Sequence, residues 1–271
     1  MNAQSVALFW TRRLGISVGF LLCGLFVFVF GTNYYSVFPT NDSQAYRVIL
    51  AGVILGAALA LRRNESAEPY SHIAYAFFIA TVTYLITSLT AGMREPLFRT
   101  INVPMDTPLH LALIKVYEIV LVVATILILS KLWGNDLGSL YIKKGRLGLS
   151  LFIGLSLLVI NAATGIATGA ALGRAGDELV AQFPWALVFS LANGFMEELL
   201  FRGLFLRRVS AVIGEVGSII VTSIVFTVMH AAASYMNPVE AVLFQIIIFP
   251  MALLFAYLMH KTDNVWGAAL Y

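Results

Sequence analysis

Residues 183–206 read FPWALVFSLANGFMEELLFRGLFL. The stretch is long enough to cross a bilayer, which requires about 20 mostly apolar residues. Three ionisable side chains interrupt it: Glu197, Glu198 and Arg202. Charged groups at membrane depth are costly, and by default they mark a functional site. The stretch therefore predicts both a membrane-spanning helix and the place of a site on it.

The composition of the whole chain is that of a polytopic membrane protein. Of the 271 residues, 60% are hydrophobic and 11% are charged, whereas a soluble domain is usually about 45–50% apolar and about 25% charged. The net charge of +3 fits basic residues kept in cytoplasmic loops, so no nucleic-acid partner is expected. The lone Cys23 cannot form an internal disulfide.

Apolar runs of spanning length recur along the chain and predict an all-α bundle of about eight transmembrane helices in one domain, residues 1–271. We expect Pro184 to begin the sixth span, because proline favours the first position of a helix. Residues 39–43 and 93–108 are expected to be loops. The predicted spans are residues 14–31, 46–61, 73–92, 109–133, 147–172, 184–209, 216–233 and 239–259.

The distribution of basic residues predicts the orientation of this bundle. Cytoplasmic loops carry an excess of lysine and arginine, and the bias places the N-terminus in the cytoplasm of a bacterial or archaeal cell. The residues expected on the cytoplasmic side are Arg12, Arg13, Arg62, Arg63, Lys131, Lys143, Lys144, Arg146, Arg207, Arg208 and Lys261.

The spacing of the charged residues on the sixth span separates the two glutamates. Glu198 and Arg202 are four apart, so they share a helix face and can pair. Glu197 is rotated from Glu198 by about 100° and can face a cavity, where a carboxylate can act as a general base or acid. A pair that only fixes helix packing remains the alternative for Glu198 and Arg202. Asn193, one turn before Glu197, can bond into the site or link helices.

The following helix carries a histidine that can meet these carboxylates. His230 follows Phe226 by one turn, and a short turn at residues 214–217 joins the two helices, so we expect antiparallel neighbours. A histidine can bind a metal, or orient water and share its proton. A packing role near a helix end is the alternative for His230.

Two paired motifs, Glu-Glu-x-x-x-Arg at residues 197–202 and Phe-x-x-x-His at residues 226–230, resemble the CPBP family of intramembrane proteases. This family takes in type II CAAX prenyl endopeptidases and bacteriocin-processing (Abi) relatives. The resemblance covers residues 149–271, whereas residues 1–148 match only as generic membrane helices. It implies an endopeptidase in the lipid bilayer that cleaves peptides or protein tails. Prenylated substrates are not expected in a bacterium.

The resemblance also implies roles for the motif residues. Glu197 would activate a water, Glu198 and Arg202 would support it, His230 would hold the water or the oxyanion, and Phe226 would pack beside the site. Both a metal-free glutamic mechanism and a metalloprotease are open. His-Glu-x-x-His, the usual zinc-protease signal, is absent, but Glu197, Glu198 and His230 can still ligate a divalent metal such as zinc.

The family pattern adds a later helix with His-x-x-x-Asn, and the sequence reaches Tyr271 at what resembles the lead-in to it. His260 and Asn264 have that spacing, but the polar residues 261–263 predict a turn between them. If the final histidine is absent, a second hypothesis gains weight: a non-catalytic membrane protein that confers bacteriocin immunity or scaffolds a partner. A proton-coupled transporter that uses Glu197 or Glu198 is a third hypothesis.

Overall fold

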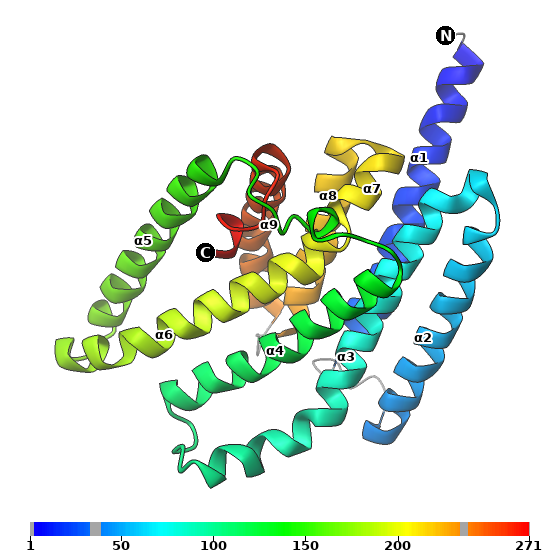
Figure 1. The fold of residues 1–271 in the computed structure, drawn as a ribbon. Helices are drawn as coiled ribbons and strands as arrows, with labels where there is room; N and C mark the ends of the chain where they lie inside the picture. Colours follow the sequence, from blue (N-terminus) through cyan, green and yellow to red (C-terminus); the bar gives the residue numbers. More distant parts are fainter. Residues whose placement is uncertain (1–2, 33–38, 234–237, 271) are drawn as a thin grey trace. The chain divides into compact units, whose positions relative to one another are not determined.

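The computed structural model describes residues 3–32, 39–233 and 238–270, and within these ranges all the regular structure is helical (Figure 1). The all-α prediction is confirmed. The elements are α1 Ala3–Gly24, η1 Leu25–Phe30, α2 Thr40–Arg62, η2 Glu65–Ala67, α3 Glu68–Thr100, α4 Pro108–Leu132, η3 Leu137–Leu140, α5 Leu147–Ala171, α6 Gly176–Glu197, η4 Glu198–Gly203, α7 Leu206–Ile213, α8 Glu215–Ala233, α9 Pro238–Thr262 and η5 Ala268–Leu270.

Seven helical segments in the described part of the chain are long and apolar enough to cross a membrane. A helix satisfies all of its interior backbone groups, which is why long apolar runs become helices in lipid. The seventh predicted span, residues 216–233, corresponds to α8, whose apolar part, Glu215–His230, is shorter than these seven segments. The cytoplasmic N-terminus and the single domain stay predictions.

Three expectations about helix ends were wrong. Residues 93–100 belong to α3, with Pro96 inside the helix, and Pro184 lies inside α6, which begins at Gly176. Residues 40–43, expected in a loop, form the first turn of α2. Proline is a weaker helix stop in membrane segments, because neighbouring helices and local adjustments satisfy the freed backbone groups.

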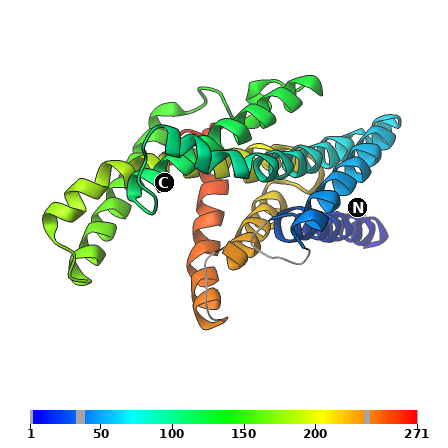
Figure 2. The same ribbon diagram turned by 90° about the horizontal axis from the view of Figure 1, so that it is seen from below.

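Contacts between Cα atoms divide the chain into two compact units. The first comprises residues 1–85 and 201–257. Its core is a cluster of phenylalanine rings, in which Phe28 contacts Phe201 and Phe77 contacts Phe205 with ring centroids 4.7 and 4.6 Å apart. In this unit α8 packs against α1 and α7 (Figure 2).

The second unit comprises residues 86–200 and 258–271. Here α4 and α6 lie side by side and run in the same direction (Figure 1). A short turn joins α5 to α6, at the left of both ribbon views (Figures 1 and 2). At this turn Gly169 gives α5 and α6 a close contact, since a Cβ there would lie 2.7 Å from Leu179 Cδ2.

Candidate active site

The Glu-Glu motif lies where the backbone of one helix changes its hydrogen-bonding pattern. Glu197 is the last residue of α6, and Glu198 begins a six-residue π-helical segment, Glu198–Gly203. Such π-turns inside α-helices are uncommon and occur frequently at functional sites. The continuous α-helix expected over residues 184–209 is therefore wrong: α6 ends at Glu197, and a separate helix, α7, begins at Leu206. A helix with i to i+5 bonds alters the spacing on which the predicted pairing of Glu198 and Arg202 was based.

The two carboxylates differ in burial. Glu198 is 4% exposed, whereas Glu197 is only partly buried. Arg202, at the other end of the π-helical segment, is fully buried. A buried charge requires a counter-charge or hydrogen bonds, which agrees with a supporting role for Glu198 and Arg202. Their direct pairing stays a prediction.

Arg202, Phe226 and His230 come together in the first unit. The Arg202 guanidinium lies 4.2 Å from the centroid of the Phe226 ring, a cation–π distance, and its Nη2 donates to the Ala252 carbonyl at 3.3 Å. The ring centroids of Phe226 and His230 are 4.2 Å apart. Phe226 therefore packs against both Arg202 and His230, and its role in a site stays a prediction.

A backbone hydrogen bond fixes the tautomer of His230. Its Nδ1 lies 2.8 Å from the carbonyl oxygen of Phe226. A carbonyl can only accept, so Nδ1 carries the hydrogen, and the neutral ring then presents Nε2 as an acceptor. An imidazole in this state can accept a hydrogen bond from water.

Asn193 lies on α6 one turn before Glu197 and is half-buried. Its side chain makes no hydrogen bond to any residue that the structure describes. No hydrogen bond among the described residues therefore supports a role for Asn193 as a polar link between helices. Its place in the site stays a prediction.

The segment after α9 packs against α6, a contact that the sequence did not predict. The Trp266 ring stacks on Phe195 at a centroid distance of 5.9 Å, two residues before Glu197. The Trp266 indole Nε1 donates to the Lys143 carbonyl at 3.0 Å. An apolar run of only a few residues gave no sign that it would form a short 3₁₀ turn, Ala268–Leu270, against α5 and α6.

Asn264 holds this segment in place. Its Oδ1 accepts from Ser150 Oγ at 2.7 Å, and its Nδ2 donates to the Lys144 carbonyl at 3.1 Å. Asn264 lies beyond the end of α9, and Asp263 before it has a φ of 56°. The prediction that His260 and Asn264 do not share a helical face is confirmed.

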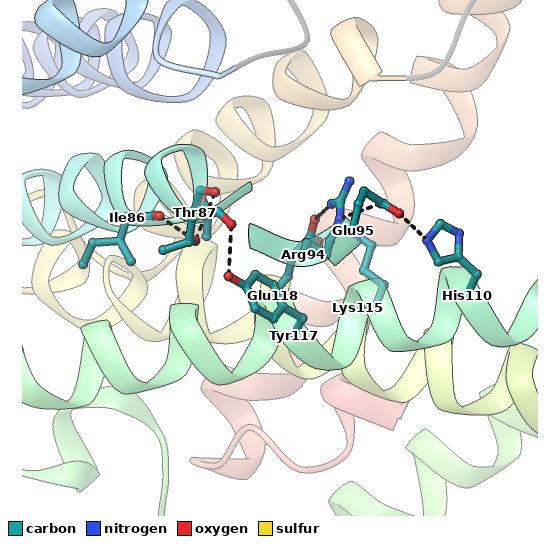
Figure 3. A network of polar contacts seen from close by, with 9 residues as sticks. Ile86, Thr87, Arg94, Glu95, His110, Lys115, Tyr117 and Glu118 are labelled. Atoms are coloured by element: carbon teal, nitrogen blue, oxygen red, sulfur yellow. Dashed lines mark hydrogen bonds and ion pairs between the residues drawn. The ribbon is translucent and has the colours of Figure 1, made fainter. Parts of the chain in front are cut away.

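A polar network lies between the end of α3 and α4 (Figure 3). Lys115 Nζ lies 2.8 Å from Glu118 Oε2, and Arg94 Nη1 approaches Oε1 of the same glutamate at 3.7 Å. His110 Nε2 lies 3.2 Å from Glu95 Oε2. These charges compensate one another within the network.

Metal ligation by Glu197, Glu198 and His230 stays a prediction. Among the described residues, no three or more His, Cys, Asp or Glu side chains are grouped as metal ligands are.

Comparison with known families bears on the C-terminal part of the chain. Residues 179–271 match a family model described as type II CAAX prenyl endopeptidase Rce1-like. This segment is similar to the Rce1-like family. The match covers about a third of the chain and confirms the predicted resemblance to CAAX proteases. No curated protein and no solved structure matched the chain.

The Rce1-like segment holds every residue predicted for the site: Asn193, Glu197, Glu198, Arg202, Phe226 and His230. The match to this family supports a protease that acts on peptide or protein substrates. Together with the seven apolar helices, it supports an integral membrane protein.

Proposed function

We propose that this protein is an intramembrane endopeptidase in which Glu197 activates the attacking water. The observation that carries the proposal is the Rce1-like match over residues 179–271, which contains both paired motifs. The match favours a protease over an immunity protein, a scaffold or a transporter.

In the proposed reaction, Glu197 accepts a proton from a water while the water oxygen attacks the carbonyl carbon of the scissile peptide. His230 orients that water, since its Nδ1 hydrogen is committed to the Phe226 carbonyl and its Nε2 can accept from the water. The tetrahedral oxyanion then collapses, the C–N bond breaks, and Glu197 returns the proton to the departing amine. No net oxidation occurs and no co-reactant besides water is consumed.

Glu198 and Arg202 support this chemistry from buried positions. Arg202 is held on one side by the Phe226 ring and by the Ala252 carbonyl. In this proposal the buried arginine supports Glu198, and Glu197 is the carboxylate that contacts the water. Glu197 is also the more accessible of the two glutamates.

The proposed substrates are peptide segments or protein tails that reach the membrane. The test uses purified protein in detergent and a library of quenched fluorescent peptides, some carrying a prenylated cysteine. Wild-type protein is expected to cleave at least one peptide, and Glu197→Gln and His230→Ala are expected to abolish that cleavage while unfolding at the wild-type temperature. A preference within the library identifies the substrate class.

Matched controls are available on the same chain. Glu65→Gln changes an exposed glutamate in η2, and His260→Ala changes a histidine in the last turn of α9. Both are expected to keep wild-type activity. Full activity in Glu197→Gln, or its loss in the controls as well as in the site variants, would remove the assignment.

A further inference from the structure

An open groove lies between α5 and α6 within the second unit. It has a volume of about 300 Å³ and is lined by residues 158–166 of α5 and 179–190 of α6. The contact of Gly169 with Leu179 closes one end, where the short turn joins the helices. Beyond the other end, the segment after α9 contacts both α5 and α6. The spacing of the two helices is thus set at both ends.

The groove lies in line with Glu197 along α6. An α-helix turns about 100° per residue, and Leu179, Ala186 and Ser190 precede Glu197 by about 5, 3 and 2 turns. These residues line the groove, and each is rotated from Glu197 by only about 20° or less. Glu198 is about 100° away from this face. The groove therefore leads along the helix to the proposed base and not to its buried neighbour.

Two polar side chains stand in the groove's apolar walls. Asn161 comes from α5 and Ser190 from α6, and neither bonds to another residue in the described ranges. Gln182, which also lines the groove, has its amide engaged by Arg174 and Glu178. Unsatisfied polar groups are costly in a bilayer, so an occupant that offers hydrogen-bonding groups is favoured over a hydrocarbon chain.

We propose that this groove binds an apolar peptide segment of the substrate in an extended conformation, with its backbone amides bonded to Asn161 and Ser190. This inference rests on the proposed protease function. The groove wall from Leu179 to Ser190 is about 16 Å long, which accommodates about five extended residues. Ser190 to Glu197 adds about 10 Å, so the bound segment begins about three residues from the scissile bond.

Filling the groove tests this proposal. A Cβ at Gly165 meets no atom within 4 Å, so Gly165→Leu projects into open groove space without a clash. Gly148→Leu is the matched control, since Gly148 also has open space but does not line the groove. We expect Gly165→Leu to raise KM about tenfold for a peptide long enough to occupy the groove, with kcat nearly unchanged. Asn161→Leu should raise KM about fivefold, and both effects should vanish with a peptide truncated to three residues on the groove side.

A binding measurement separates failure of the groove from failure of the protease assignment. The photoreactive residue p-benzoylphenylalanine is placed at position 165 or 148 of the Glu197→Gln protein. A biotinylated synthetic peptide of about eight apolar residues is then added. Cross-linking at position 165 that unlabelled peptide competes away, and none at position 148, supports the proposal even if Glu197→Gln leaves activity intact. Equal labelling at both positions overturns it. So does competition by an isoprenoid alcohol but not by peptide, or a KM that Asn161→Leu leaves unchanged.

Discussion

Ser150 and Asn264 are joined by a hydrogen bond of 2.7 Å between the Ser150 hydroxyl and the Asn264 Oδ1. Ser150 lies in the first turn of α5, and Asn264 follows the end of α9. The same hydroxyl oxygen accepts from the backbone N–H of Gly267 at 2.8 Å. One buried serine thus connects α5 to two points of the segment that stacks Trp266 on Phe195, beside Glu197.

We expect Asn264→Leu to destabilise the fold more than Ser150→Ala does. The leucine removes the bonds of Asn264 to Ser150 and to the Lys144 carbonyl and leaves buried partners unsatisfied, a loss of about 2–4 kcal/mol. Ser150→Ala should cost about 1–3 kcal/mol. Thermal unfolding in detergent measures both. Ser156→Ala, which changes an exposed serine bonded only within its own helix, serves as the control. Unchanged unfolding in Asn264→Leu would contradict the anchoring role.

The backbones of Gly154 and Gly267 lie so close together that a side chain at Gly154 should disturb the fold. A Cβ on Gly154 would lie 2.3 Å from the Gly267 carbonyl oxygen, and backbone cannot yield as a flexible side chain can. Gly154→Ala should therefore lower the unfolding temperature and the cleavage rate together, because it displaces the segment that packs against α6. Gly148→Ala, in open space on the same helix, should be neutral or slightly stabilising. Equal behaviour of the two variants would show that the contact does not matter.

Loss of different members of the polar network between α3 and α4 should lower the unfolding free energy by different amounts. Glu118 faces both Lys115 and Arg94, so Glu118→Gln leaves two cations without their shared carboxylate. Lys115→Met removes one cation, but Arg94 remains beside the Glu118 carboxylate. We expect Glu118→Gln to cost about 2 kcal/mol of unfolding free energy and Lys115→Met less. Glu178→Gln, in an exposed pair with Arg174, should change little. A larger loss in Lys115→Met than in Glu118→Gln would refute this arrangement.

The coupling between Glu198 and Arg202 can be measured by a double-variant cycle. If the two side chains pair, the unfolding free energies of Glu198→Gln and Arg202→Met should be non-additive by about 1–3 kcal/mol in the double variant. Single loss of Arg202 should be the more severe, since the arginine also contacts Phe226 and the Ala252 carbonyl. Additive losses would mean that the glutamate and the arginine are held by different partners.

The sequence predicts the helices well where apolar runs are long and uninterrupted, as in α4, α5 and α9. It misplaces helix ends at Pro96 and Pro184, because proline's cost depends on neighbouring groups that satisfy the freed carbonyls. The π-helical turn at Glu198 could not be anticipated either. Its hydrogen bonds involve the backbone, and residues 198–203 are ordinary helix formers apart from Gly203.

For the site, the sequence identified ionisable residues that are costly in lipid. The expected direct succession of the two site helices was wrong, because α7 lies between η4 and α8. The sequence showed no sign of the contacts that residues 263–270 make with α5 and α6. Phe195 and Trp266 are more than 60 positions apart in the chain, and Ser150 and Gly267 are more than 100 apart. Such contacts depend on the tertiary fold. The short apolar run gave no periodicity from which they could be inferred.

The most direct test of the central claim compares the single-turnover cleavage rate of Glu197→Gln with that of Glu198→Gln, each set beside its unfolding temperature. If Glu197 is the base and Glu198 a buried support, Glu197→Gln should lower the cleavage rate by a factor of about 10²–10⁴. Its unfolding temperature should equal that of the wild type. Glu198→Gln should lower both quantities. A Glu197→Gln protein that cleaves at the wild-type rate, with Glu198→Gln inactive and stable, would contradict the account and assign the base to Glu198.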